Sequence, residues 1–179
     1  MKEVIVVGAG ASGVAAAVSC GRNIGGENVL LLEKNDRILK KINATGNGKC
    51  NITNSNGREF TRVKSFLESL GLTIIPEDEG RMYPMSKRAE DVVSAFNREI
   101  KNLNIALHLN ENVLSVVKKD GYFIVKTNSN TFAAISLHIA IVTIPSNAKT
   151  NLHEYFCSVR FIRHSCQTEN RNRLCSGSD

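Results

Sequence analysis

The chain opens with short apolar runs on either side of a stretch of small residues. The run Val4-Ile5-Val6-Val7 is apolar at every position, which is typical of a strand buried on both faces of a parallel sheet. Residues 14–18 are small and apolar, which favours a helix that packs closely on that strand, and Gly25-Gly26 ends it. Residues 28–32 then predict a second buried strand. Strand, helix and strand together predict one βαβ unit.

Helical and alternating patterns continue along the middle of the chain. Residues 60–70 carry apolar side chains at helical spacing and Gly71 is their stop signal. A longer helix is expected around Ala89–Ile100, with Ser86 as its candidate N-cap. Asp120-Gly121 predicts a hairpin turn. Strands are expected at 105–108, 113–117, 122–126 and 132–142. The predicted fold class is therefore α/β: a Rossmann-like parallel sheet with helices and a small antiparallel β-meander.

The apolar periodicity fades from about Asn147. We therefore interpret residues 1–145 as one domain and residues 146–179 as an unassigned, poorly ordered tail. Three of the five cysteines, Cys157, Cys166 and Cys175, lie in this tail. A zinc site there is conceivable, but the spacing matches no known ligand pattern, so no metal is expected. An odd number of unevenly placed cysteines also argues against a disulfide framework.

Composition narrows the class of protein. With 179 residues, 42% hydrophobic and 22% charged, the chain is typical of a soluble globular domain. No apolar run approaches the roughly 18 residues that a membrane span requires. Because no signal-peptide pattern is visible, we expect a cytoplasmic protein without a membrane partner. The net charge of +6 suits an anionic partner but does not choose among a nucleotide, a nucleic acid and a membrane surface.

The first strand runs directly into the motif Gly-Ala-Gly-Ala-Ser-Gly, which begins the helix. In a dinucleotide-binding loop, Gly8 permits the tight turn, Gly10 lets the backbone approach a pyrophosphate, and Gly13 lets helix and strand pack closely. The helix N-terminus, with Ala11 and Ser12, supplies N–H groups and a partial positive charge to the phosphates.

An acid, Glu33, ends the second strand twenty residues after Gly13. A carboxylate at this place accepts hydrogen bonds from ribose hydroxyls, so the two signals together predict a dinucleotide site. The alternative is a Gly-rich turn with a surface glutamate. The motif alone does not separate NAD from FAD.

A long polar stretch after Glu33 does separate them. Thr45–Asn54 reads TGNGKCNITN, and it is accompanied by LLEKN with a later Lys-Lys pair, by LGL at 70–72 and by GRMYP at 80–84. In these motifs the chain resembles the HI0933-like or BaiN-like (aminoacetone oxidase family) FAD-binding flavoproteins, over about residues 1–142. A simple NAD-binding domain would begin another helix soon after Glu33.

The resemblance implies an FAD-dependent oxidoreductase that accepts a hydride from a substrate or from NAD(P)H. It places Glu33 and Lys34 beside the adenosine ribose, and Lys41 near the phosphates, although a solvated basic pair is the alternative for Lys40-Lys41. It places Val113 at the adenine. It implies that the segment alongside the flavin contributes Thr45, Gly46, Gly48, Cys50 and Asn51. For Cys50, packing or flavin contact is favoured over thiol chemistry, and no catalytic acid or base is predicted.

The chain also departs from the pattern of these flavoproteins, which are about twice as long or longer. Their returning strand ends in A-T-G-G, whereas this chain has Thr143-Ile144-Pro145, and proline supplies no N–H. We therefore expect a truncated flavoprotein oxidoreductase, with a non-catalytic dinucleotide-binding remnant that lacks the substrate domain as the alternative. The small-molecule substrate is not identified, no nucleic-acid partner is expected, and an exposed sheet edge would invite self-association.

Overall fold

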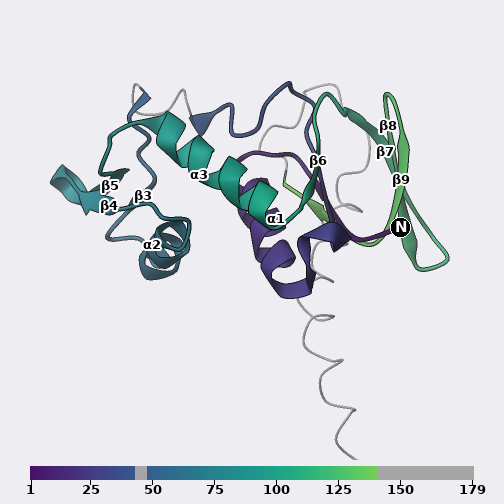
Figure 1. Cartoon of the computed structure of the whole chain (residues 1–179), viewed down its shortest axis with the longest axis horizontal. Helices are drawn as coiled ribbons and strands as arrows, with labels where there is room; N and C mark the ends of the chain where they lie inside the picture. Colours follow the sequence, from purple (N-terminus) through teal and green to yellow (C-terminus); the bar gives the residue numbers. More distant parts are fainter. Residues whose placement is uncertain (43–47, 141–179) are drawn as a thin grey trace, which may run out of the picture.

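The computed structural model describes residues 1–42 and 48–140 (Figure 1). The expectations for Thr45, Gly46, Thr143-Ile144-Pro145 and the tail from residue 146 lie outside these residues.

A six-stranded sheet forms the centre of the fold, in the order β6-β2-β1-β9-β8-β7. Strands β1 (Lys2–Val7), β2 (Val29–Leu32), β6 (Ala106–His108) and β9 (Thr131–Ile139) are parallel neighbours. Strands β7 (Val113–Lys119) and β8 (Tyr122–Thr127) are antiparallel and lead into β9. The predicted α/β fold with a parallel sheet and a meander is confirmed.

The turn between β7 and β8 confirms the hairpin signal. Asp120 and Gly121 have φ values of 49° and 83°, and two successive positive φ angles are what a type I′ turn requires. Strand β9 then pairs with β8 on one side and with β1 on the other. One strand therefore closes the meander and returns the chain to the parallel sheet beside the glycine loop.

Two helices, α1 (Ala11–Ile24) and α3 (Ala89–Asn102), pack together beside the sheet (Figure 1). Their buried side chains join Val6, Val29 and Leu31 in one core cluster. A second cluster joins the alternate side chains Ile5, Val7, Leu30 and Leu32 with Val125, Ala134 and Leu137 of the meander. Because both sets are buried, residues 4–7 of β1 and all four residues of β2 need apolar side chains, as the sequence pattern indicated.

The start of α3 differs from the prediction. The helix begins at Ala89 with Arg88 as its N-cap residue, and no side chain caps it. Ser86 lies two residues before this N-cap, and Lys87 between them has a φ of 53°. Ser86 is therefore too far from the first turn to cap it, and that prediction is wrong.

A second, three-stranded antiparallel sheet was not predicted. It has the order β3-β5-β4, from β3 (Thr53–Asn54), β5 (Arg81–Pro84) and β4 (Ile74–Pro76), with the short helix η3 (Asp78–Gly80) between β4 and β5. Helix α2 (Phe60–Glu68) lies beside it, and Figure 1 shows this group at the opposite end of the molecule from the meander. A second short helix, η1 (Gly26–Asn28), connects α1 to β2.

Strand β7 forms one edge of the large sheet. Leu114 and Val117 on this strand are 60% and 55% exposed, and Tyr122 and Ile135 on the neighbouring strands are also exposed. The expected self-association through a sheet edge stays a prediction. Within the described residues, no helix combines the length and apolar character needed to cross a membrane.

His138 on β9 makes stability depend on pH. Burial lowers the pKa of this imidazole below its ordinary value of 6.5, because desolvation disfavours the cation. Below pH 6.5 the unfolded chain binds more protons at this position than the folded chain does, so stability is full above 6.5 and declines as the pH falls. We expect the thermal midpoint of unfolding to be lower at pH 5 than at pH 7. The variant His138→Gln is expected to show a smaller decrease over the same pH range. An identical decrease in the variant would contradict the assignment.

Candidate dinucleotide-binding site

Two of the three glycines in the motif serve the packing of the chain itself. Gly8 follows β1 with a φ of 96°, and its N–H donates to the Leu32 carbonyl at 2.8 Å. A Cβ atom placed on Gly13 would lie 1.8 Å from the Gly8 carbonyl oxygen and 3.1 Å from the Ala140 Cβ. The tight turn and the close helix–strand contact therefore require glycine at these two positions, as predicted.

Gly10 is different, because none of the residues that the structure describes excludes a side chain there. Its φ of −73° is open to any residue, and a Cβ atom would meet no heavy atom of residues 1–42 and 48–140 within 4 Å. Gly10 is the N-cap residue of α1, with no side-chain cap and no acid in the first turn, and Ala11 and Ser12 are exposed. The first N–H groups of a helix have no intrahelical partner. An uncapped helix N-terminus beside open space fits a phosphate group.

Glu33 is held against this loop. Its side chain is 7% exposed, and Oε2 accepts a hydrogen bond from the Ala9 N–H at 2.7 Å. The other oxygen, Oε1, accepts from the Asn35 N–H at 2.9 Å and from the Asn35 side-chain amide. The surface-glutamate alternative is therefore wrong. The carboxylate joins the end of β2 to the glycine loop, a role that sequence reasoning did not foresee.

The polar stretch after Glu33 folds back onto the glycine loop. The Leu39 N–H donates to the Ala9 carbonyl at 2.8 Å, and the Ile38 and Leu39 side chains are buried in the core. Lys34 and Lys41 are exposed on either side of this anchor. Sequence reasoning passed over Ile38 and Leu39, although two consecutive apolar residues within a polar stretch are a visible signal for such an anchor.

The segment assigned to the flavin end is described from Gly48 onward. Gly48 has a φ of 82° and open space at its Cβ position, and Asn51 is exposed. Cys50 is 3% exposed and packs in the core cluster of α1 and α3. Because a reactive thiol must be accessible, this burial favours packing for Cys50.

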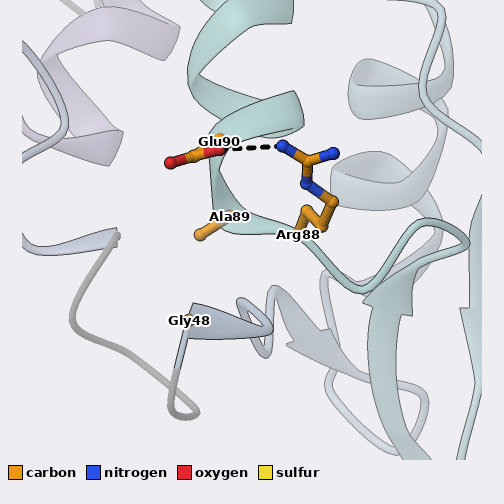
Figure 2. Close-up of a pocket in the computed structure, with 4 residues that line it drawn as sticks. All are labelled: Gly48, Arg88, Ala89 and Glu90. Carbon is orange, nitrogen blue, oxygen red and sulfur yellow. Dashed lines mark hydrogen bonds and ion pairs between the residues drawn. The ribbon is translucent and has the colours of Figure 1, made fainter.

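A small open pocket of about 230 Å³ lies between Gly48 and the start of α3 (Figure 2). It is lined by Gly48, Arg88, Ala89 and Glu90. The Arg88 guanidinium donates to Glu90 at 2.9 Å, and this bond raises the pKa of Arg88. The volume is below the roughly 300 Å³ typical of small-molecule sites, so this pocket could hold only part of a dinucleotide.

Val113 begins β7 and is half-buried. The loop before it contacts the end of β2, because the Glu111 N–H donates to the Glu33 carbonyl at 2.9 Å and the Asn110 N–H to the Asn35 carbonyl at 3.0 Å. The structure thus brings Glu33, the glycine loop and the connection that leads to Val113 together at the carboxyl ends of β1 and β2. Within residues 1–42 and 48–140, no cluster of His, Cys, Asp and Glu side chains suits a metal ion.

Comparison with known proteins agrees with this geometry. Residues 2–65 match the HI0933-like protein Rossmann domain. A 3-dehydro-bile acid delta(4,6)-reductase of Clostridium scindens is 29% identical, with 75% of this chain and 37% of the relative covered. A ribosomal RNA dihydrouridine synthase of Escherichia coli is 26% identical, with 77% and 38% covered. The resemblance to HI0933-like flavoproteins is confirmed, and the chain spans somewhat over a third of the length of these relatives.

The fold is also found among solved structures. Thioredoxin reductase of Lactococcus lactis superposes with a TM-score of 0.54 at 17% identity, over 88% of this chain and 41% of that protein. A likeness at this level of identity concerns the fold alone. It confirms the Rossmann-like arrangement of the described residues.

Proposed function

We propose that this chain binds FAD through its glycine loop and forms the cofactor-binding part of a flavoprotein oxidoreductase. The observation that carries the proposal is the contrast among the three glycines. Gly8 and Gly13 are required by the packing of the chain, whereas Gly10 leaves space that the described residues do not fill, beside an uncapped helix N-terminus. A side chain at Gly10 would occupy that space, which explains a glycine there if a pyrophosphate occupies it instead.

The residues divide the cofactor among them. In this proposal the N–H groups of the first turn of α1 bind the pyrophosphate, and Lys41 contributes positive charge nearby. Glu33 and Lys34 lie at the ribose, and the backbone at Val113 lies at the adenine. Thr45, Gly46, Gly48, Cys50 and Asn51 form the wall along the flavin. Bound FAD would supply two-electron transfer, with NAD(P)H as the proposed donor.

The two curated relatives bear on substrate choice. One is named for a bile-acid reductase and the other for a ribosomal RNA dihydrouridine synthase, yet each aligns with about three quarters of this chain, so the two alignments overlap. A segment that is shared by proteins named for such different substrates is suited to a function that both need, such as cofactor binding. We therefore propose that residues 1–140 contribute cofactor binding and that they do not select the substrate.

The choice of FAD over NAD is open to direct test. We expect the purified chain to bind FAD in equilibrium dialysis, and to bind NAD at least tenfold more weakly. The reason is that the proposal assigns the stretch from Glu33 to Asn54 to the flavin-bearing half of FAD, which NAD lacks. Retention of NAD with exclusion of FAD would contradict the proposal. Addition of NADPH to the FAD-loaded chain distinguishes the two roles: bleaching of the flavin absorbance supports an oxidoreductase, and its absence supports the binding-only alternative.

A further inference from the structure

Glu111 is a buried acid that the proposed cofactor contacts do not use. In the part of the chain that the structure describes, the buried polar or charged side chains are Glu33, Glu111 and Thr127. Glu111 lies in the connection between β6 and β7. The sequence around it has no apolar pattern that would predict burial of its side chain. Burial of a carboxylate is unfavourable unless hydrogen-bond donors surround it, so its partners indicate what it is for.

The partners of Glu111 lie on the turn between β8 and β9. The Thr127 hydroxyl donates to Oε2 and the Asn130 side-chain amide donates to Oε1 at 2.5 Å. The turn is itself closed by Thr127, whose N–H donates to the Asn130 carbonyl at 2.9 Å and whose hydroxyl accepts from the Asn130 N–H at 2.9 Å. The carboxylate therefore binds both ends of the turn at once.

The backbone of Glu111 faces the other way, toward the proposed cofactor site. Its N–H donates to the Glu33 carbonyl, and the Glu33 N–H donates to the His108 carbonyl at 2.9 Å. The backbone of Glu33 is thus held by the last residue of β6 and by the β6–β7 connection, while its carboxylate accepts from the Ala9 N–H. The contacts form one chain from the β8–β9 turn through Glu111 and Glu33 to the glycine loop.

We infer that Glu111 is a positioning residue for the adenosine end of the cofactor site. It fixes the β6–β7 connection against the β8–β9 turn, so that Glu33 is held at the glycine loop and the backbone at Val113 is fixed before the ligand arrives. Preorganisation of this kind raises the affinity for the ligand, because fewer backbone groups and side chains lose conformational freedom on binding. The inference rests on the proposed binding of FAD, and it concerns a residue that contacts the ligand only through others.

A donor–acceptor swap tests the inference. In Glu111→Gln an amide N–H₂ replaces one of the two carboxylate oxygens that accept from Thr127 and Asn130, so one charged acceptor is lost. We expect FAD and ADP each to bind about tenfold more weakly, the effect of about one lost hydrogen bond to a charged group. Binding of FMN, which lacks the adenosine, is expected to be unchanged. Combining Glu111→Gln with Asn130→Asp restores a donor and an acceptor, and we expect most of the FAD affinity to return.

The outcomes distinguish failure of the proposed FAD binding from failure of the proposed role of Glu111. Failure of the wild-type chain to bind FAD or ADP would overturn the proposed function. Wild-type binding with no loss in Glu111→Gln would overturn the role of Glu111, as would an equal loss for FMN. If Glu111→Gln does not fold, Asn130→Ala, at an exposed position, removes one donor and is expected to weaken FAD about threefold. Unchanged FAD affinity in that variant would also count against the inference.

Discussion

Gly13→Ala is expected to lower the free energy of unfolding by about 3 kcal/mol or more, at the upper end of what overpacking costs. The new Cβ atom would lie 1.8 Å from the Gly8 carbonyl oxygen and 3.0 Å from the Gly8 carbonyl carbon. Both atoms belong to the backbone, so neither can turn aside as a flexible side chain would. Relief requires α1 to move away from β1, which would open the core cluster. Urea unfolding followed by circular dichroism measures the loss.

Gly10→Ala is the matched control. A methyl group there meets no atom in the part of the chain that the structure describes, and the φ of −73° suits alanine, so we expect at most about 1 kcal/mol of destabilisation, as for a poorer N-cap residue. FAD affinity is expected to fall about tenfold or more, since the methyl group occupies the space assigned to the pyrophosphate. Wild-type stability in Gly13→Ala would contradict the packing of the loop. Wild-type FAD affinity in Gly10→Ala would contradict the phosphate site.

The elements that could be predicted from sequence are those whose causes are local. Residues 4–7 of β1 and all of β2 are apolar because both faces of the sheet are buried there, and the Asp120-Gly121 turn requires two positive φ angles. The β3-β5-β4 sheet escaped prediction because its strands have only two to four residues, too few to show a period of two. Two of them also end in proline. Their pairing is decided by contacts across the fold.

The same division applies to the site. The roles of Gly8 and Gly13 follow from backbone geometry at a known spacing, so the motif alone predicts them. The partners of Glu111 could not be predicted, because Thr127 and Asn130 come within its reach only when β8 pairs with both β7 and β9. The failed N-cap at Ser86 has a related cause. A capping residue is predicted from its position immediately before the first helical turn. Here the helix begins at Ala89, and Lys87 has a positive φ, so Ser86 lies two residues before the N-cap position.

Glu33→Ala is expected to affect stability and binding together. The buried carboxylate accepts from the Ala9 N–H and from both the backbone and the side chain of Asn35. Its removal leaves these donors without their acceptor, and we expect a loss of about 2–4 kcal/mol in the free energy of unfolding. The control is Glu3→Ala, an exposed acid on β1, which is expected to stay within about 0.5 kcal/mol of wild type.

The two measurements on Glu33→Ala address different roles. Equal stability of the variant and the wild type would mean that the carboxylate does not hold the glycine loop. A destabilised variant that keeps wild-type FAD affinity would mean that the carboxylate acts on the fold alone and that the ribose is bound elsewhere. We expect both quantities to fall, with FAD affinity reduced at least tenfold, because the carboxylate that fixes the Ala9 N–H is the one assigned to the ribose hydroxyls. If the alanine variant does not fold, Glu33→Gln can replace it, because glutamine keeps the shape of the side chain and removes one acceptor. Stability and FAD affinity are then compared with wild type in the same way, and we expect about half the loss of stability.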